Sequence, residues 1–335
     1  MATPFELLDL DGREVRLTNP DKVFFPKRGI TKRQLVDYYL EVMDGVLVGC
    51  GDRPMTMYRW PNGVDAPDDA FYQKRVGDKR PEWMRTAMIK FPSGRSAEMI
   101  VGADSAHVVY ALNLGCIDLN PWPVRATDVD HPDELRVDLD PTPGIEYADV
   151  RKTAAVAREV LDEHGLTGWP KTSGKRGMHV YVRLEPKWTF YEVRRAALAL
   201  AREVERRAPS LATTAWWKEE RHGVFVDYNQ NARDRTIASV YSVRPFPDAR
   251  VSCPLEWSEV PDVEPDDLRI DTVPERYRSI GDPGAGIDDA VCPLEPLLEL
   301  ADRDEAGGLG DAPWPPHFPK AKNEPTRAQP SKRRN

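Results

Sequence analysis

The segment of residues 135–144, Leu-Arg-Val-Asp-Leu-Asp-Pro-Thr-Pro-Gly, constrains the fold more than any other part of this chain. Apolar residues alternate with polar ones up to Asp140, and this period of two is typical of a β-strand. Side chains two residues apart in a strand point to the same face, so Asp138 and Asp140 share one. Pro141 and Gly144 then end the strand. The pattern therefore predicts two neighbouring carboxylates at the mouth of a strand.

A third acid follows another apolar strand pattern, Gly-Val-Phe-Val-Asp, which ends at Asp227. Three carboxylates at strand ends suit two hard divalent cations, which activate an attacking oxygen and stabilise a leaving one in phosphoryl transfer. An Asp-x-Asp pair on a strand is more often a solvated surface. The segments between and after the acids decide between these two interpretations.

Residues 172–182, Thr-Ser-Gly-Lys-Arg-Gly-Met-His-Val-Tyr-Val, form a small, basic turn that leads into a strand. Glycines let backbone N–H groups approach a phosphate, and Lys175 and Arg176 add positive charge. His179 opens the strand and becomes a candidate donor to a phosphate oxygen. The turn lacks the Gly-x-x-x-x-Gly-Lys-Ser/Thr pattern of a P-loop. An ordinary hairpin connection, with His179 packed as a polar core residue, is the alternative.

Amides and arginines follow Asp227 and form the third candidate segment. They are Gln230, Asn231, Arg233, Arg235 and Arg244. Such side chains suit contacts to phosphates and bases. The alternative is that the arginines pair with surface acids, which are plentiful because the chain holds 55 Asp and Glu residues.

These segments together resemble the archaeo-eukaryotic primase superfamily. The nearer resemblance is to the polymerase domain of bacterial ATP-dependent end-joining DNA ligases and its stand-alone relatives. It spans about residues 15 to 260, in the order Leu17-Thr-Asn-Pro-Asp-Lys22, Arg59-Trp-Pro-Asn-Gly63, Val137-Asp-Leu-Asp-Pro141, Ser173 through His179, and Val224-Phe-Val-Asp227 through Asn231. The resemblance implies an α+β catalytic core with mixed sheets flanked by helices.

The resemblance also implies roles for individual residues. Asp138, Asp140 and Asp227 match the metal-binding catalytic acids, with two Mn²⁺ or Mg²⁺ ions and manganese preferred. The residues that match the nucleotide site are Ser173, Lys175, Arg176, His179, Gln230 and Arg244. Ser173 is linked in the family to a preference for ribonucleotides. Asn19, Lys22 and Lys32 match a pocket for the DNA 5′-phosphate beyond a gap, and Phe71 and Tyr72 match an aromatic pair that stacks on the template.

Three positions depart from the family pattern. Asn120, in Ile-Asp-Leu-Asn, stands where relatives have a histidine; we keep it as a nucleotide-binding candidate that cannot carry a proton. Tyr58 replaces a lysine, so one nucleotide contact is lost or changed. Phe71-Tyr72 replaces Phe-Phe, and because any base stacks on an aromatic face, stacking survives this change.

Composition limits the class of protein. The chain has 335 residues, 40% of them hydrophobic, which is enough for a large core. We expect no membrane span and no secretion signal, because no long apolar run and no leader pattern are visible. Four scattered cysteines, Cys50, Cys116, Cys253 and Cys292, predict reduced thiols in the cytoplasm of a bacterium, near the nucleoid.

The net charge of −8 is unevenly distributed. Residues 254–305 hold 16 acids and 4 basic residues, whereas residues 13–33 hold 7 basic residues and 2 acids. Local positive surface rather than net charge must therefore attract nucleic acid, and we expect modest, salt-sensitive binding.

Helical spacing after the capping box of Thr31 and Gln34 predicts a helix that starts near Lys32. Further helices are predicted at 147–164 and 191–207, between strands at 136–140, 178–183 and 224–227. Trp216 and Trp217 are assigned to the core. We expect a catalytic domain over residues 1–300 and a Pro/Gly-rich, disordered tail over 301–335, in which Trp314 and Phe318 could dock.

The leading hypothesis is a monomeric, template-dependent nucleotidyltransferase that fills short gaps in DNA repair. It would use NTP or dNTP on gapped or broken double-stranded DNA that carries a 5′-phosphate, and a separate ATP-dependent ligase would seal the product. A primase that starts chains without a primer and a non-catalytic module that bridges DNA ends and recruits a ligase are the alternatives. End joining and excision repair are both open as pathways.

Overall fold

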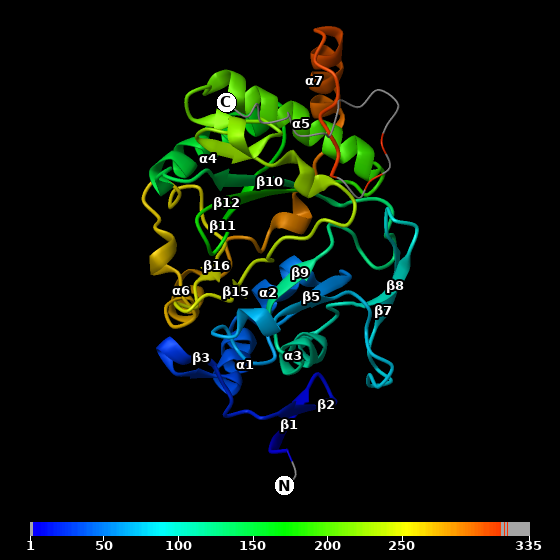
Figure 1. Ribbon diagram of the computed structural model, residues 1–335, viewed down its shortest axis with the longest axis vertical. Helices are drawn as coiled ribbons and strands as arrows, with labels where there is room; N and C mark the ends of the chain where they lie inside the picture. Colours follow the sequence, from blue (N-terminus) through cyan, green and yellow to red (C-terminus); the bar gives the residue numbers. More distant parts are fainter. Residues whose placement is uncertain (1–2, 316–317, 319, 321–335) are drawn as a thin grey trace, which may run out of the picture.

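The computed structural model describes residues 3–315, 318 and 320 of the chain (Figure 1). The N-terminal half is built from two-stranded hairpins, one small sheet and three helices. The hairpins are β1 (Phe5–Leu10) with β2 (Arg13–Thr18), β3 (Val23–Phe25) with β4 (Ile30–Thr31), and β7 (Thr86–Lys90) with β8 (Ser96–Ile100). The antiparallel sheet has the order β6 (Phe71–Gln73), β5 (Met55–Arg59), β9 (Cys116–Pro121). The helices are α1 (Lys32–Glu41), α2 (Met43–Cys50) and α3 (Ser105–Asn113).

A five-stranded sheet organises the C-terminal half. Its order is β11 (Trp169–Thr172), β12 (Met178–Arg183), β10 (Glu134–Pro141), β14 (Val224–Val226), β13 (Ala212–Thr213). The pairs are antiparallel except for β13 and β14, which run parallel. Helices α4 (Tyr147–Glu163) and α5 (Phe190–Arg207) pack together on the sheet (Figure 1). The hairpin β15 (Ser242–Val243) and β16 (Val251–Ser252) and the helices α6 (Val273–Ile280) and α7 (Glu295–Ala306) complete the fold.

The predicted elements are confirmed with small shifts. Thr31 and Gln34 form the capping box, which satisfies backbone donors at the helix start, and α1 begins at Lys32. β12 has the predicted bounds, and α5 begins one residue earlier than predicted. The α+β class is confirmed, since helices cover a mixed sheet. No helix in the described part of the chain has the length and apolar content that crossing a membrane requires.

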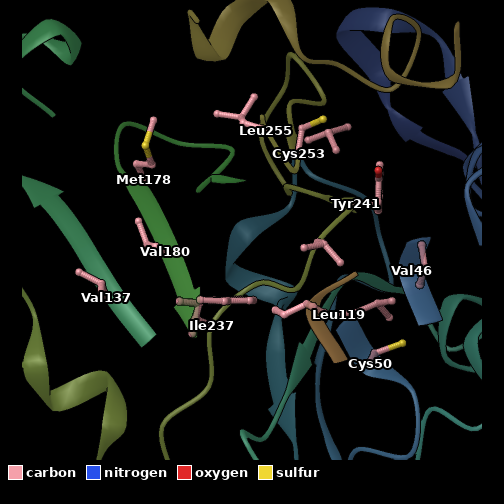
Figure 2. Packing of buried hydrophobic residues seen from close by; sticks show 14 of the residues in the cluster. Val46, Cys50, Leu119, Val137, Met178, Val180, Ile237, Tyr241, Cys253 and Leu255 are labelled. Carbon is pink, nitrogen blue, oxygen red and sulfur yellow. The ribbon is translucent and has the colours of Figure 1, made fainter. Parts of the chain in front are cut away.

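One large apolar core joins the two halves. Val137 and Val180 face each other across β10 and β12, and both are buried. Figure 2 shows these two residues together with Leu119 of β9 and Ile237 of the chain before β15. All four cysteines are buried and free, as expected for reduced thiols. Because the core is continuous, the polar face of the five-stranded sheet is held against the N-terminal half.

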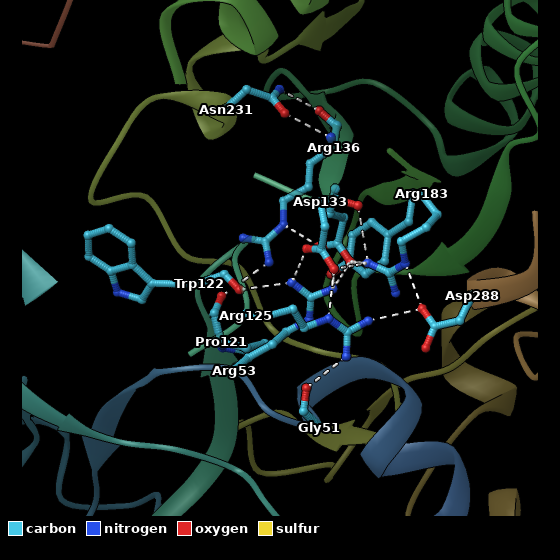
Figure 3. Close-up of polar contacts among 12 residues, drawn as sticks. Gly51, Arg53, Pro121, Trp122, Arg125, Asp133, Arg136, Arg183, Asn231 and Asp288 are labelled. Carbon is cyan, nitrogen blue, oxygen red and sulfur yellow. Dashed lines mark hydrogen bonds and ion pairs between the residues drawn. The ribbon is translucent and has the colours of Figure 1, made fainter. Parts of the chain in front are cut away.

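A buried ion network ties β10 to the N-terminal half (Figure 3). Arg53 is fully buried and binds both oxygens of Asp133, at 2.5 and 2.9 Å. Arg125 binds the same carboxylate at 2.7 Å, and the Arg136 guanidinium binds Glu134 at 2.7 Å. Burial opposes the charge on Asp133, yet the surrounding arginines lower its pKa well below the ordinary value. Removing one partner of such a buried pair is costly because the other charge stays uncompensated.

Two predictions about packing need correction. Trp216 and Trp217 are only half-buried and border a cavity, so they are not core residues. The domain boundary expected at residue 300 falls inside α7, which continues to Ala306. Arg202 binds the carbonyl of Gly310 at 2.6 Å, so the chain still contacts α5 beyond that helix. Most of the predicted disordered tail lies outside the described residues.

Candidate active site

Sheet register gathers the three predicted acids on adjacent strands. Leu139 pairs with Val226, and the Asp227 amide donates to the Asp138 carbonyl at 2.8 Å. Asp138 and Asp227 are therefore opposite each other across β10 and β14, where cross-strand side chains are about 5 Å apart. Asp140 lies two residues further along β10, on the same face, and is exposed. Residues 89 positions apart in sequence thus form one acidic edge.

Burial raises the pKa of Asp138 well above its ordinary value, and the charges of Asp140 and Asp227 raise it further. A hydrogen bond from Gln230 and the charge of Lys171 act in the opposite direction. Burial is also the main cause of the raised pKa of Asp227. Three carboxylates that disfavour each other's ionisation are a site where a cation would be stabilising.

The donor chemistry fits a hard divalent cation, although the side chains do not converge. Among residues 3–315, 318 and 320, no three His, Cys, Asp or Glu side chains stand in a metal-binding arrangement. Asp138 and Asp227 are nonetheless a cross-strand pair and Asp140 lies on the same face, so the three acids line one edge of the sheet. Asp138, Asp140 and Asp227 are the residues that would hold it.

The turn after β11 is closed by its own serine. The Ser173 hydroxyl oxygen accepts from the amides of Lys175 at 3.2 Å and Gly177 at 3.0 Å. Gly174 has a φ of +67°, which glycine adopts at little cost. Lys175 and Arg176 are exposed at the tip, and their charges act on Asp140. The predicted basic turn therefore lies directly beside the acidic edge.

His179 is buried on β12 and faces Asp138, with 3.4 Å between its Nε2 and the carboxylate. Burial lowers the pKa of His179 well below its ordinary value, so the ring is neutral. Lys171 lies opposite His179 on β11 and donates to the Ala238 carbonyl at 2.9 Å and to Ser252. His179 therefore lies behind the acids rather than in the exposed turn.

Arg244 reaches the turn from the other side, donating to the Ser173 carbonyl at 3.2 Å. Its Nε lies 3.7 Å from the carboxylate of Asp118 on β9. Asn120 is buried two residues further along β9 and donates to the Asp118 carbonyl at 3.4 Å. Asp118 is a site residue that the sequence analysis missed, although its Ile-Asp-Leu-Asn alternation puts it on the same strand face as Asn120.

The residues predicted for the 5′-phosphate also come together. Lys22 donates to the Pro61 carbonyl at 2.6 Å, and the Lys32 amide donates to the Lys22 carbonyl at 2.8 Å. Asn19 begins the turn that carries Lys22, with a φ of +51°. Lys32 is only 4% exposed, and its ammonium group donates to Thr18 and Asn113 carbonyls. Burial, with Lys22 and Arg59 nearby, lowers the pKa of Lys32 to about 8.

The predicted template-stacking pair is exposed on β6. Phe71 is 44% exposed and Tyr72 is 65% exposed. Tyr72 stacks on Tyr58, with ring centroids 4.2 Å apart. Tyr58 is the position at which a departure from the family pattern was expected, and its ring forms an aromatic stack with the exposed Tyr72.

Asn229 and Arg194, which the sequence patterns did not single out, hold the Asp227 carboxylate in place through hydrogen bonds. The Asn229 amide donates to the Asp227 carboxylate at 2.9 Å, and Arg194 of α5 donates to the Asn229 side chain at 2.9 Å. Arg194 also binds Asp311 at 2.8 Å and lies 4.0 Å from the ring of Trp314. No local pattern links Arg194 to residues more than a hundred positions away.

Comparison with known proteins shows the family to which the chain belongs. The family model described as LigD, primase-polymerase domain, matches residues 31–284. The chain belongs to this family. The solved polymerase domain of Mycobacterium tuberculosis ligase D, in complex with DNA, has a TM-score of 0.77 and 30% sequence identity. The alignment covers 83% of this chain and 99% of that one.

LigD family proteins described as multifunctional or bifunctional non-homologous end joining proteins are similar in sequence. The Mycolicibacterium smegmatis protein is 31% identical over 92% of this chain, and the Bacillus subtilis protein is 30% identical over 81%. The chain covers 40% and 43% of their lengths. The predicted resemblance is therefore confirmed at the level of the primase-polymerase domain.

Proposed function

We propose that this protein is a template-dependent DNA nucleotidyltransferase that extends a primer across a short gap. The observation that carries the proposal is the acidic edge of Asp138, Asp140 and Asp227 beside the basic turn that Ser173 closes. Acidic side chains can hold the metal ions that activate the attacking hydroxyl, and a basic turn can bind a triphosphate. Nucleotidyl transfer requires both side by side.

The three aspartates would hold two divalent ions, Mn²⁺ or Mg²⁺. When bound, these ions supply Lewis acidity at the α-phosphate and lower the pKa of the attacking hydroxyl. Lys175 and Arg176 attract the phosphates, and Arg244 steadies the turn through the Ser173 carbonyl. The Ser173 oxygen accepts hydrogen bonds from two backbone amides, so its own O–H remains available as a donor. A hydrogen bond from this O–H to the sugar of the nucleotide would support a preference for ribonucleotides.

The DNA substrate we propose is a gapped or broken duplex with a 5′-phosphate downstream. Lys22 and Lys32, together with the N-terminus of α1, concentrate positive charge for that phosphate. The exposed Phe71 and Tyr72 suit stacking on template bases. Because the similar proteins are described as end joining proteins, we propose that an ATP-dependent DNA ligase seals the product, in end joining.

The test is primer extension on a duplex with a gap of one to three nucleotides. We expect metal-dependent incorporation that is greater with Mn²⁺ than Mg²⁺, with NTP than dNTP, and with a downstream 5′-phosphate than a 5′-hydroxyl. Absence of templated incorporation under all these conditions contradicts the proposal. Incorporation without any advantage from the 5′-phosphate contradicts only the assignment of Lys22 and Lys32.

A further inference from the structure

A cavity of about 600 Å³ borders the loop between β13 and β14. In the sheet order these strands lie on the other side of β10 from β11 and β12, which the basic turn connects. Asp140 and Asp227 form one wall, and Trp216 and Trp217 form another. Arg235 also lines the cavity, which is large enough for a nucleotide-sized ligand. Apart from Asp140 and Asp227, the family resemblance assigned no role to the residues that line this cavity, and both tryptophans were expected in the core.

The two tryptophans belong to the loop between β13 and β14. Their rings meet edge to face, with centroids 6.3 Å apart and planes at 78°. Arg221 fixes the loop from within, because it donates to the Ala215 carbonyl at 2.9 Å and to the Trp216 carbonyl at 3.1 Å. The Arg221 guanidinium itself lies 3.4 Å from the Phe225 ring of β14. The loop therefore holds two half-buried aromatic rings beside the acids by a specific anchor.

Position relative to the acids indicates the occupant. The basic turn borders a different pocket, whose charged lining residues are the cations Lys27, Lys175, Arg176 and Arg250 and one acid, Asp248. Its excess of positive charge suits triphosphate oxygens. The cavity beside the tryptophans is left for the component that brings the attacking hydroxyl to the acids. That component is the 3′ end of a nucleic-acid strand.

The charges around the cavity suit the same occupant. Lys218, Arg221 and Arg235 can neutralise strand phosphates, while Glu219 of the loop and the two aspartates oppose them. Every nucleic-acid base has a face that stacks on an aromatic ring, so stacking supplies affinity that charge alone does not. Aromatic stacking next to a mixed charge pattern favours a strand end over a free phosphate.

We propose that Trp216 and Trp217 form a stacking platform for the terminal nucleotides of the primer strand. This inference rests on the proposed nucleotidyl transfer, because that function requires a primer. The platform holds the 3′ terminus against the acidic edge while the triphosphate occupies the opposite side. Neither tryptophan takes part in bond formation.

The experiment uses the full chain and a primer–template duplex with a dideoxy-terminated primer, which binds without reacting. 2-Aminopurine at the primer terminus reports stacking by loss of fluorescence, and the same base five positions upstream is the control. The W216L/W217L variant keeps apolar bulk without aromatic rings, and W216F/W217F keeps aromatic rings. W257L is the matched control, since Trp257 is also half-buried but lines a separate cavity on α4.

We expect W216L/W217L to lose terminal quenching and to bind the duplex at least about fivefold more weakly, with the KM for nucleotide unchanged. W216F/W217F should retain most of both signals, and W257L should match the wild type. Wild-type quenching and duplex affinity in W216L/W217L overturn the platform. The two proposals can be contradicted separately. A wild-type protein that stacks the primer terminus but never extends it contradicts the proposed function. Extension by W216L/W217L with an unchanged primer KM contradicts the stacking platform.

Discussion

The side-chain amide of Asn231 pairs with the backbone of Arg136 in both directions, with both hydrogen bonds at 2.8 Å (Figure 3). β14 ends at Val226, and Asp227 makes the last strand-like bond to β10. Beyond it the chain turns into a short 3₁₀ helix, Tyr228–Asn231. Asn231 thus replaces a strand residue opposite Arg136. Asp227 and Gln230 are held between two fixed points on β10.

Asn231→Asp should reduce turnover by an order of magnitude or more while leaving the fold intact. The acid keeps an acceptor for the Arg136 amide but sets an oxygen against the Arg136 carbonyl, which leaves a buried polar group unsatisfied at about 1–3 kcal/mol. Steady-state extension kinetics and the thermal unfolding midpoint measure the two effects. The turnover loss should exceed what the stability loss explains.

Gln34→Glu is the matched control for Asn231→Asp, because it makes the same amide-to-acid change at the exposed capping box of α1. A glutamate still closes that box, so the unfolding midpoint should stay at the wild-type value, and so should turnover on a gap with a 5′-hydroxyl, where no downstream phosphate meets the added charge. Wild-type turnover in Asn231→Asp would show that the two hydrogen bonds between Asn231 and the Arg136 backbone do not position Asp227.

Lys32 predicts a pH dependence of DNA binding. Its pKa of about 8 means that the free protein loses this positive charge as pH rises from 7 to 9. The affinity advantage of a 5′-phosphate over a 5′-hydroxyl should therefore decline across that range. Dissociation constants for the two duplexes measure it, and Lys32→Gln, neutral at every pH, should give a smaller and flat advantage. A constant advantage in the wild type would contradict the role of Lys32.

The same group predicts a stability change of definite sign. The unfolded chain holds the lysine proton up to its ordinary pKa of about 10.4, whereas the folded protein releases it near 8. The unfolded state then binds more protons between these values, so this group's contribution to folding stability rises with pH over that interval. Thermal unfolding of the wild type and Lys32→Gln from pH 7 to 10 measures the difference.

Arg194 should influence catalysis without contacting any reactant. It connects Asn229, which binds Asp227, to Asp311 and to the ring of Trp314. Arg194→Met should free Asn229 and lower turnover severalfold, with little change in the KM for nucleotide. Arg195→Met is the control, because Arg195 is the next residue of α5 and pairs with Asp302 and Glu305 of α7 instead. Equal turnover in both variants would contradict the link.

Local patterns predicted the strands and helices that carry the acids, because periodicity reports which face is buried. They also predicted Asp138 and Asp140 on one face. The register that places Asp227 opposite Asp138 depends on pairing across 89 residues, which a single sequence does not reveal. Trp216 and Trp217 were wrongly predicted to be core residues. Only the tertiary structure shows that they border a cavity.

The contacts between residues far apart in sequence could not be predicted, for a physical reason. Asn231 replaces a strand residue only because β14 ends early, and Arg194 bonds to residues 117 to 119 positions away. Neither arrangement leaves a periodic or compositional signal. The family resemblance identified the acids and the basic turn, but it did not include Asp118, Asn229 or the two tryptophans.

The most direct test of the central claim is extension by the D138N/D140N variant on a one-nucleotide gap with Mn²⁺ and NTP. The account predicts that incorporation falls below detection while binding of the gapped duplex is retained or strengthened, because two negative charges are removed without loss of shape. Metal-dependent incorporation at the wild-type rate in this variant would contradict the claim that the acidic edge is the catalytic site.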